Sequence, residues 1–217
     1  MSGSTTVQRL LEAHGRTYAE EAGIRLRDTP MPLFQLLTLC VLLSARIKAG
    51  IAVAAARELF DAGMRTPAAM AEASWQDRVD ALGRAHYRRY DESTATALGE
   101  AARLALDRYR GDLRRLREDA AGEPGQVREL LREFPRIGPV GADIFSREAQ
   151  GVWPELRPAF DERARDAADA LGLPHAPDEL ALLVDDEDLP RLAAALVRTR
   201  LDRRDEGASP VDGAPRA

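Results

Sequence analysis

Apolar residues recur at helical spacing along almost the whole chain, and no stretch shows the strict alternation of a half-buried strand. One segment, from Pro32 to Ala45, is apolar nearly all round, which is typical of a helix at the centre of a bundle. The pattern therefore predicts an all-α fold. Helices are expected over 7–18, 32–45, 52–60, 75–82, 91–109, 127–134, 139–145, 161–172 and 188–201.

Cap and turn residues separate these helices. Thr66 followed by Pro67, and Ser74, are residues that favour a helix N-terminus. The polar stretch 118–126 contains glycine and proline and predicts a break. The stretch 151–160 has two prolines and one glycine and is expected to be a loop.

Composition narrows the function classes. Apolar residues make up 45% of the 217 residues and charged residues 31%, as in globular proteins. The single cysteine, Cys40, excludes a disulfide scaffold, a four-cysteine zinc site and a four-cysteine iron–sulfur cluster. His14 and His175 have no metal partner at useful spacing, so we expect no metal site. Among 31 basic residues only Lys48 is a lysine.

The net charge of −5 is unevenly distributed. Residues 31–160 carry 19 basic and 18 acidic side chains, whereas residues 161–217 carry 8 basic and 14 acidic ones. The near-neutral central block could form a positive face. The longest apolar run, Leu36–Leu43, is too short to cross a bilayer, and no signal peptide is seen, so we expect a cytoplasmic protein without a membrane partner.

The stretch from Leu130 to Phe145 carries the most chemical information. Pro135 is expected to end one helix, Gly138 to relieve steric limits in the turn, and Pro139 to open a second helix. Such stretches are also common as ordinary connections between helices, and this interpretation has equal weight from these residues alone.

If the turn binds a ligand, an anionic oxygen fits it best. The free amides of Gly138, Val140 and Gly141 would point outward from a helix N-terminus, where a DNA phosphate is well accommodated. Carbonyl groups of the turn could hold a monovalent cation, Na⁺ or K⁺. Arg136 at the tip adds positive charge.

This stretch resembles the helix-hairpin-helix of the endonuclease III-like DNA glycosylase superfamily, in which a Gly/Pro-rich loop and an aspartate follow the hairpin. Here the loop begins at Gly151 and the aspartate is Asp161. The segments from Pro32 to Arg46 and from Arg65 to Met70 are also similar to family elements. The resemblance covers about residues 30–175 and adds Ile137 to the residues that would contact DNA.

Departures from the family decide the expected chemistry. Bifunctional members carry a nucleophilic lysine in the second hairpin helix, where this chain has Val140. The segment Leu36–Leu43 has no acid, which weighs against the adenine-excising branch, and the iron–sulfur cysteines are absent. Arg136 stands where the family usually has glycine. The resemblance therefore indicates a diverged branch.

Two cations occupy the segment that fills the duplex gap in the family. Arg46 stands where glutamine is frequent and could fill the space of an extruded base; a surface arginine at a helix end is an equally good interpretation. Lys48 could reach DNA, as a phosphate contact or a solvated charge rather than a nucleophile. Four aromatic side chains are candidate pocket walls, although each is more usually packing: Trp75, Tyr87, Tyr90 and Trp153.

Asp161 is the candidate catalytic residue. Breaking an N-glycosidic bond develops positive charge on the sugar, which a nearby carboxylate stabilises, and the same group can orient the attacking water. A plain helix N-cap explains an aspartate at this position equally well in steric terms, and both roles can coincide.

The resemblance implies a two-lobed all-α fold of the helix-hairpin-helix glycosylase type. A six-helix barrel is expected over 31–133, and a second lobe over 1–30 together with 134–202; 203–217 would be a flexible tail. The expected function is a monofunctional DNA N-glycosylase of base excision repair, acting as a monomer on damaged or abasic duplex DNA at the nucleoid. The alternatives are a non-catalytic binder of damaged DNA on the same fold and a helical interaction domain unrelated to DNA.

Overall fold

The computed structural model describes residues 3–207, which contain helices and no strand. This confirms the all-α fold class expected from the periodicity. Two short 3₁₀ turns, Pro154–Leu156 and Asp186–Asp188, interrupt the later part of the chain. The α-helices are α1 (Gly3–His14), α2 (Tyr18–Glu21), α3 (Pro30–Leu43), α4 (Ala49–Asp61), α5 (Pro67–Glu72), α6 (Trp75–Arg84), α7 (Asp91–Tyr109), α8 (Arg114–Asp119), α9 (Pro124–Leu131), α10 (Pro139–Ala149), α11 (Glu162–Ala170), α12 (Pro177–Ala181) and α13 (Leu189–Gly207).

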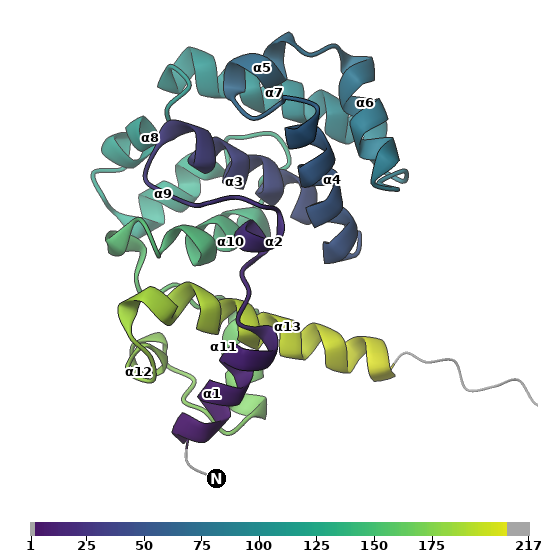
Figure 1. Ribbon diagram of the computed structural model, residues 1–217. Coiled ribbons are helices and arrows are strands. Elements are labelled where there is room, and N and C mark those ends of the chain that lie inside the picture. Colours follow the sequence, from purple (N-terminus) through teal and green to yellow (C-terminus); the bar gives the residue numbers. More distant parts are fainter. Residues whose placement is uncertain (1–2, 208–217) are drawn as a thin grey trace, which may run out of the picture.

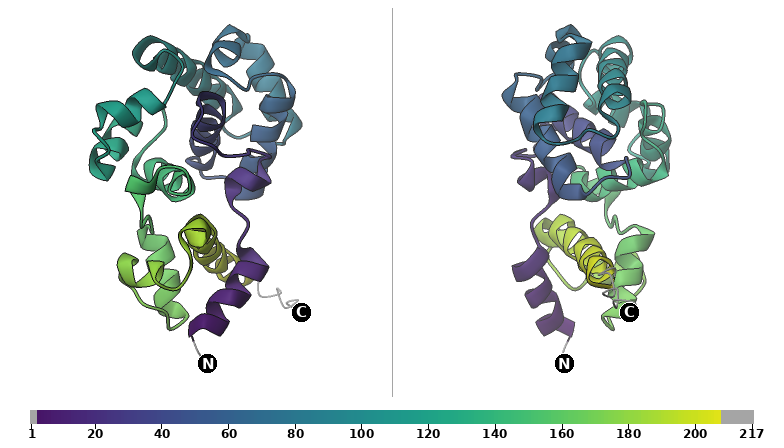
Figure 2. Two further views of the ribbon diagram at one scale, coloured as in Figure 1. Left: turned by 60° about the vertical axis from the view of Figure 1, so that its left-hand side comes forward. Right: turned by 90° about the vertical axis from the view of Figure 1, so that its right-hand side faces the viewer.

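The helices form two bodies (Figure 1). Helices α2 to α10 make the larger body, and α1, α11, α12 and α13 make the smaller one. The chain crosses between the bodies twice, before α2 and after α10 (Figure 2), and α13 of the smaller body packs against α10 of the larger one. No helix within residues 3–207 is both long and apolar enough to span a membrane.

Helix α3 is the centre of the larger core. Its residues from Pro32 to Leu42 are all buried, and the helix packs against α4, α7 and α10. An all-round apolar helix can bury every face only in such a central position, so the expectation from the sequence is confirmed.

Two separate hydrophobic cores follow the two bodies. The larger one extends from Tyr18 to Leu156 and includes the hairpin side chains Phe134 and Phe145. The smaller one joins Val7 and Leu10 of α1 to apolar residues between 160 and 197. The hairpin side chains therefore belong to the larger core. The division into a six-helix barrel over 31–133 and a second lobe over 1–30 together with 134–202 stays a prediction.

Several helix ends have the caps that the sequence indicates. The Thr66 hydroxyl accepts a hydrogen bond from the Ala69 amide at 3.2 Å, and the Ser74 hydroxyl accepts one from the Asp77 amide at 3.1 Å. Helix α7 spans the expected 91–109 range. Helix α13 continues to Gly207; of the expected tail 203–217, residues 208–217 lie outside the described chain.

The expected first helix, 7–18, is wrong at its end. Helix α1 stops at His14, and Thr17 begins the separate helix α2 through a capping box with Glu20. A capping box satisfies amides at a new helix start, so the hydroxyl of Thr17 competes with continuation of α1. Tyr18 consequently belongs to the larger core, not to the face of α1.

Helix α10 carries a buried acid that fixes α2. Glu148 is 3% exposed, and its two carboxylate oxygens accept hydrogen bonds from the amides of Tyr18, at 3.2 Å, and Ala19, at 2.9 Å. Burial raises the pKa of the Glu148 carboxyl, against the opposing effects of the Ala19 amide and the Arg147 charge. The start of α2 is thereby attached to the middle of the molecule.

Replacing Glu148 by alanine should lower the free energy of unfolding by about 3 kcal/mol at pH 5, because two buried amides lose their acceptor. The folded protein binds more protons than the unfolded chain between the unfolded value, near 4.5, and the raised folded pKa. The difference between wild type and Glu148→Ala should therefore shrink as pH rises through that window. Urea denaturation at pH 5, 6 and 7 measures it.

The exposed Glu187, replaced by alanine in the same way, should change the free energy of unfolding by less than about 0.5 kcal/mol. A difference for Glu148→Ala that grows with pH would contradict the assigned direction of the pKa.

Candidate active-site cleft

The turn between α9 and α10 has the form of a helical hairpin. The Ile137 amide donates to the Phe134 carbonyl at 3.0 Å, and the Ala142 amide donates to the Gly138 carbonyl at 3.0 Å. The residue in the left-handed region is Arg136, with φ of +65°. Gly138 has φ of −92° and an open space at its Cβ position, so the expectation that Gly138 relieves the turn is wrong.

The side chain of Arg136 is bound to α7. Its guanidinium donates to the hydroxyls of Thr94, at 3.2 Å, and Ser93, at 3.0 Å, and lies 5.9 Å from the centre of the Tyr90 ring. These contacts stabilise a left-handed residue that costs about 1–2 kcal/mol outside glycine. Arg136 therefore joins the hairpin to α7, and its exposed charge remains beside the turn.

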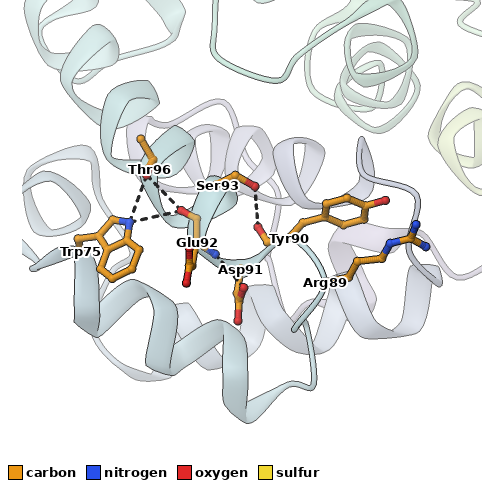
Figure 3. Close-up of a pocket in the computed structure, with 7 residues that line it drawn as sticks. All are labelled: Trp75, Arg89, Tyr90, Asp91, Glu92, Ser93 and Thr96. Carbon is orange, nitrogen blue, oxygen red and sulfur yellow. Dashed lines mark hydrogen bonds between the residues drawn. The ribbon is translucent and has the colours of Figure 1, made fainter.

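The hollow next to this junction shares no lining residue with the cleft described below (Figure 3). Its lining includes the carboxylates of Asp91 and Glu92. The Trp75 indole N–H donates to the Thr96 hydroxyl at 3.1 Å and to the Glu92 carbonyl at 3.3 Å. Trp75 is thus held by the start of α7 and does not line the cleft described below.

The other aromatic candidates are packing residues. Tyr87 and Trp153 are fully buried, and the Trp153 indole N–H donates to Asp28 at 2.9 Å. Tyr90 lies beneath Arg136 at the hairpin junction. None of these three residues lines the cleft.

The start of α10 is pressed against the end of α3. A Cβ on Gly141 would lie 2.5 Å from the Ser44 Oγ and 3.3 Å from the Ile137 side chain. Ile137 itself is 4% exposed, so its side chain serves the core rather than a ligand. The Val140 side chain is 42% exposed, and the amides of Val140 and Gly141 lie in the first turn, where no carbonyl of the same helix can accept from them.

A cleft of about 1100 Å³ lies beside this helix start. One wall is the turn between α3 and α4, with Arg46 and Lys48 both exposed. Residues of α11 and α13 line the cleft on its other side, and Val140 of α10 also belongs to its lining. Of the residues predicted for a common site, the cleft lining contains Arg46, Lys48, Val140 and Asp161. The other four, Arg136, Ile137, Gly138 and Gly141, stand outside its lining.

Asp161 lies in the cleft and also caps α11. Its Oδ1 accepts from the Ala164 amide at 2.9 Å, and its Oδ2 is bound by the guanidinium of Arg147. The side chains of Arg147 and Asp161 are 3% and 9% exposed. A carboxylate oxygen can accept more than one hydrogen bond, so each oxygen retains acceptor capacity toward the cleft. The N-cap role is observed, and it leaves the carboxylate chemically available.

Positive charge dominates the cleft despite the acidic sequence. Its lining holds one carboxylate, that of Asp161, which Arg147 already neutralises. Three exposed cations remain that form no ion pair with any described residue: Arg46, Lys48 and Arg163. Arg46 and Lys48 belong to the near-neutral central block, in which a positive face was possible, whereas Arg163 comes from the acidic C-terminal block. Together these cations attract a polyanion.

Solved structures place this arrangement in a known fold. A non-covalent endonuclease III–DNA complex superposes with a TM-score of 0.50 at 16% identity, over 91% of this chain and 85% of that one. The chain has the helical fold of endonuclease III. A trapped covalent endonuclease III–DNA intermediate, an estranged-adenine complex, gives a TM-score of 0.49 with the same identity and coverage. No family model and no curated protein matches the chain.

The endonuclease III fold confirms the helical architecture that the resemblance implied. At 16% identity it establishes the architecture and leaves the chemistry to this chain's own residues. Three residues of the cleft were not predicted from the sequence: Tyr18, Arg147 and Arg198. Arg147 stands between Ser146 and Glu148, and only its burial in the folded structure distinguishes it from a surface arginine.

The close approach at Gly141 can be measured by a double-mutant cycle. Gly141→Ala should destabilise the protein by about 1 kcal/mol, because the new methyl group displaces the Ser44 hydroxyl from the Cys40 carbonyl, its acceptor at 2.7 Å. In a Ser44→Ala background the same change should cost less than half as much. Urea denaturation of the four proteins gives the coupling; additive effects would mean that the hairpin does not press on α3 as described.

Proposed function

We propose that this protein is a DNA N-glycosylase that hydrolyses the bond between a damaged or mispaired base and its deoxyribose, with Asp161 as the catalytic carboxylate. The observation that carries the proposal is the position of Asp161, at a helix start inside a cationic cleft that also contains the exposed start of α10. The endonuclease III neighbours are DNA complexes, which supports DNA as the partner.

The hairpin and the cleft cations would hold the backbone of the damaged strand. Free amides at the start of α10 can donate hydrogen bonds to a phosphate oxygen, and Arg46 and Lys48 add charge on the adjoining wall. Extrusion of the base costs a few kcal/mol, which these contacts must supply. Arg46 can then occupy part of the vacated space in the duplex.

Asp161 would act on the sugar. As the bond from C1′ to the base nitrogen breaks, the electron pair leaves with the base and positive charge develops on the ring. The carboxylate stabilises that charge, and its unused acceptor sites can orient a water molecule toward C1′. Water adds its oxygen to C1′ and loses one proton to the carboxylate or solvent, while the departing base nitrogen takes up one proton. The products are the free base and an unbroken strand with an abasic site.

Arg147 gives a specific reason to retain a second candidate function. A guanidinium bound to Asp161 reduces the field that the carboxylate exerts on a sugar cation. A protein in which this pair persists on DNA would bind damaged or abasic duplex without releasing a base. The two functions share the fold and the cleft, and they differ in whether Asp161 does chemistry.

Asp161→Asn should reduce release of free base from damaged duplex oligonucleotides by at least about 100-fold while leaving duplex affinity within about threefold, because the amide retains the N-cap and loses the negative charge. A panel of lesions, with base release followed by chromatography and affinity by fluorescence anisotropy, tests this. The control variant Asp166→Asn, on the same helix α11, should leave base release unchanged. Tight binding to an abasic-site analogue with no base release from any lesion would establish the binding function instead.

Strand cleavage through a Schiff base should be absent, because Val140 has no nucleophile and Lys48, the single lysine, is exposed at the N-cap of α4. Borohydride should therefore trap no covalent complex with damaged DNA, and the product strand should break only after alkali. A trapped complex that disappears in Lys48→Ala would assign the nucleophile to Lys48 and make the enzyme bifunctional.

A further inference from the structure

A stacked pair of side chains stands in the cleft on the side of α13. The guanidinium carbon of Arg198 lies 4.3 Å from the centre of the Tyr18 ring. The Nη2 atom of Arg198 lies 2.9 Å from Glu21 Oε2, so both neighbours come from the short helix α2. Arg198 and Tyr18 both line the cleft that contains Asp161.

The position of Tyr18, and with it that of the pair, is fixed by Glu148 on α10. Glu148 accepts the amide of Tyr18 and holds the start of α2, as described above. Tyr18 is 4% exposed, and Arg198 covers its ring. A planar cation is therefore held over an aromatic support by Tyr18 and by the ion pair with Glu21, which limits the conformational entropy that a ligand would have to remove.

The hydrogen-bonding capacity of Arg198 is not used within the described residues. Its Nε and Nη2 are buried and make no hydrogen bond there, because the contact with Glu21 is an ion pair without hydrogen-bond alignment. The side chain is 19% exposed, and it belongs to the lining of the cleft. A guanidinium has donors only, so a ligand beside it would have to supply acceptors or a π-face.

We infer that Arg198, held on Tyr18, is the stacking platform that receives the extruded base. This rests on the proposed function. Bases stack on arginine guanidinium planes as they do on aromatic rings, and one plane of Arg198 is already supported by Tyr18. Arg198 and Asp161 line the same cleft, so a base stacked on Arg198 would occupy the space that the carboxylate also borders.

The charges around the platform specify a class of base. Arg147 and Arg163 also line the cleft, and the Asp161 carboxylate is paired with Arg147. A neutral base with carbonyl or ring-nitrogen acceptors is favoured beside these donors. An alkylated base with a positively charged ring is repelled by the guanidinium on which it would stack. Hypoxanthine and 7-methylguanine, both purines with a 6-oxo group, represent the two classes.

Binding to duplexes that cannot be cleaved tests the platform independently of catalysis. One duplex carries hypoxanthine on a 2′-fluoroarabinose sugar, and a second carries a tetrahydrofuran abasic analogue with no base. Arg198→Ala should weaken binding to the hypoxanthine duplex by about 5- to 150-fold, the range of stacking contributions, and binding to the abasic duplex by less than about threefold. Fluorescence anisotropy at fixed salt measures both.

The Arg198→Lys variant distinguishes the contribution of the planar guanidinium to binding from the contribution of its positive charge. Lysine keeps the positive charge and loses the flat guanidinium, so it should show the same base-dependent loss as alanine. Arg103→Ala removes an exposed arginine of α7 that does not line the cleft, and it should change neither affinity by more than about threefold. Thermal unfolding of each variant establishes that it is folded.

The charge class is tested by a third duplex that carries 7-methylguanine on the fluorinated sugar. Wild type should bind the hypoxanthine duplex at least about fivefold more tightly than this one, and Arg198→Ala should bring the two affinities within about twofold. Equal or tighter wild-type binding to the cationic base would overturn the assignment of the substrate class.

The remaining outcomes are distinguishable. An equal loss on the base-bearing and abasic duplexes would make Arg198 a backbone contact, and no loss on either would remove it from the site; each overturns the platform while the proposed function stands. If the wild-type protein binds damaged duplex no more tightly than intact duplex at every salt concentration, that result would overturn both the proposed function and the platform.

Discussion

The arrangement of the cleft depends on two consecutive charged residues in the second half of α10. Arg147 binds the Asp161 carboxylate at the start of α11, and Glu148 accepts two amides at the start of α2. Both side chains are almost fully buried, so each needs its partner to offset the cost of desolvation. One helix, whose first turn forms the hairpin, therefore sets the positions of both the acid and the support beneath Arg198.

This coupling explains how an acidic protein presents a cationic site. Most carboxylates of the C-terminal block, such as Asp178 and Glu179 at the start of α12, lie away from the cleft. The acid within the cleft is neutralised by a buried arginine, which leaves Arg46, Lys48 and Arg163 to determine the sign of its potential. Net charge thus describes solubility and long-range repulsion, whereas the folded arrangement decides which ligand the cleft attracts.

The hairpin departs from the pattern that its sequence first indicates. Arg136 takes the left-handed position, and its contacts with Ser93 and Thr94 on α7 offset the conformational cost. Gly141 is required by the approach of Ser44, 97 positions earlier in the chain. In both cases the choice of residue is constrained by a contact with a distant segment of the chain. Rules for turns consider only neighbouring residues and therefore cannot predict it.

The sequence by itself determined most of the longer helices, the central place of α3, the hairpin, the absence of a lysine at Val140 and the N-cap position of Asp161, because periodicity, capping and residue identity act over a few neighbouring residues. The short helices α8 and α12 were not predicted. The end of α1 was missed because the capping box at Thr17 competes locally with helical periodicity. Only the tertiary structure decided that Arg147 reaches Asp161 and that Arg198 lies on Tyr18, 180 positions away. Those contacts join helices whose relative positions are set by the packing of two cores. The sequence around an arginine does not identify its partner, because the partner comes from a distant segment of the chain.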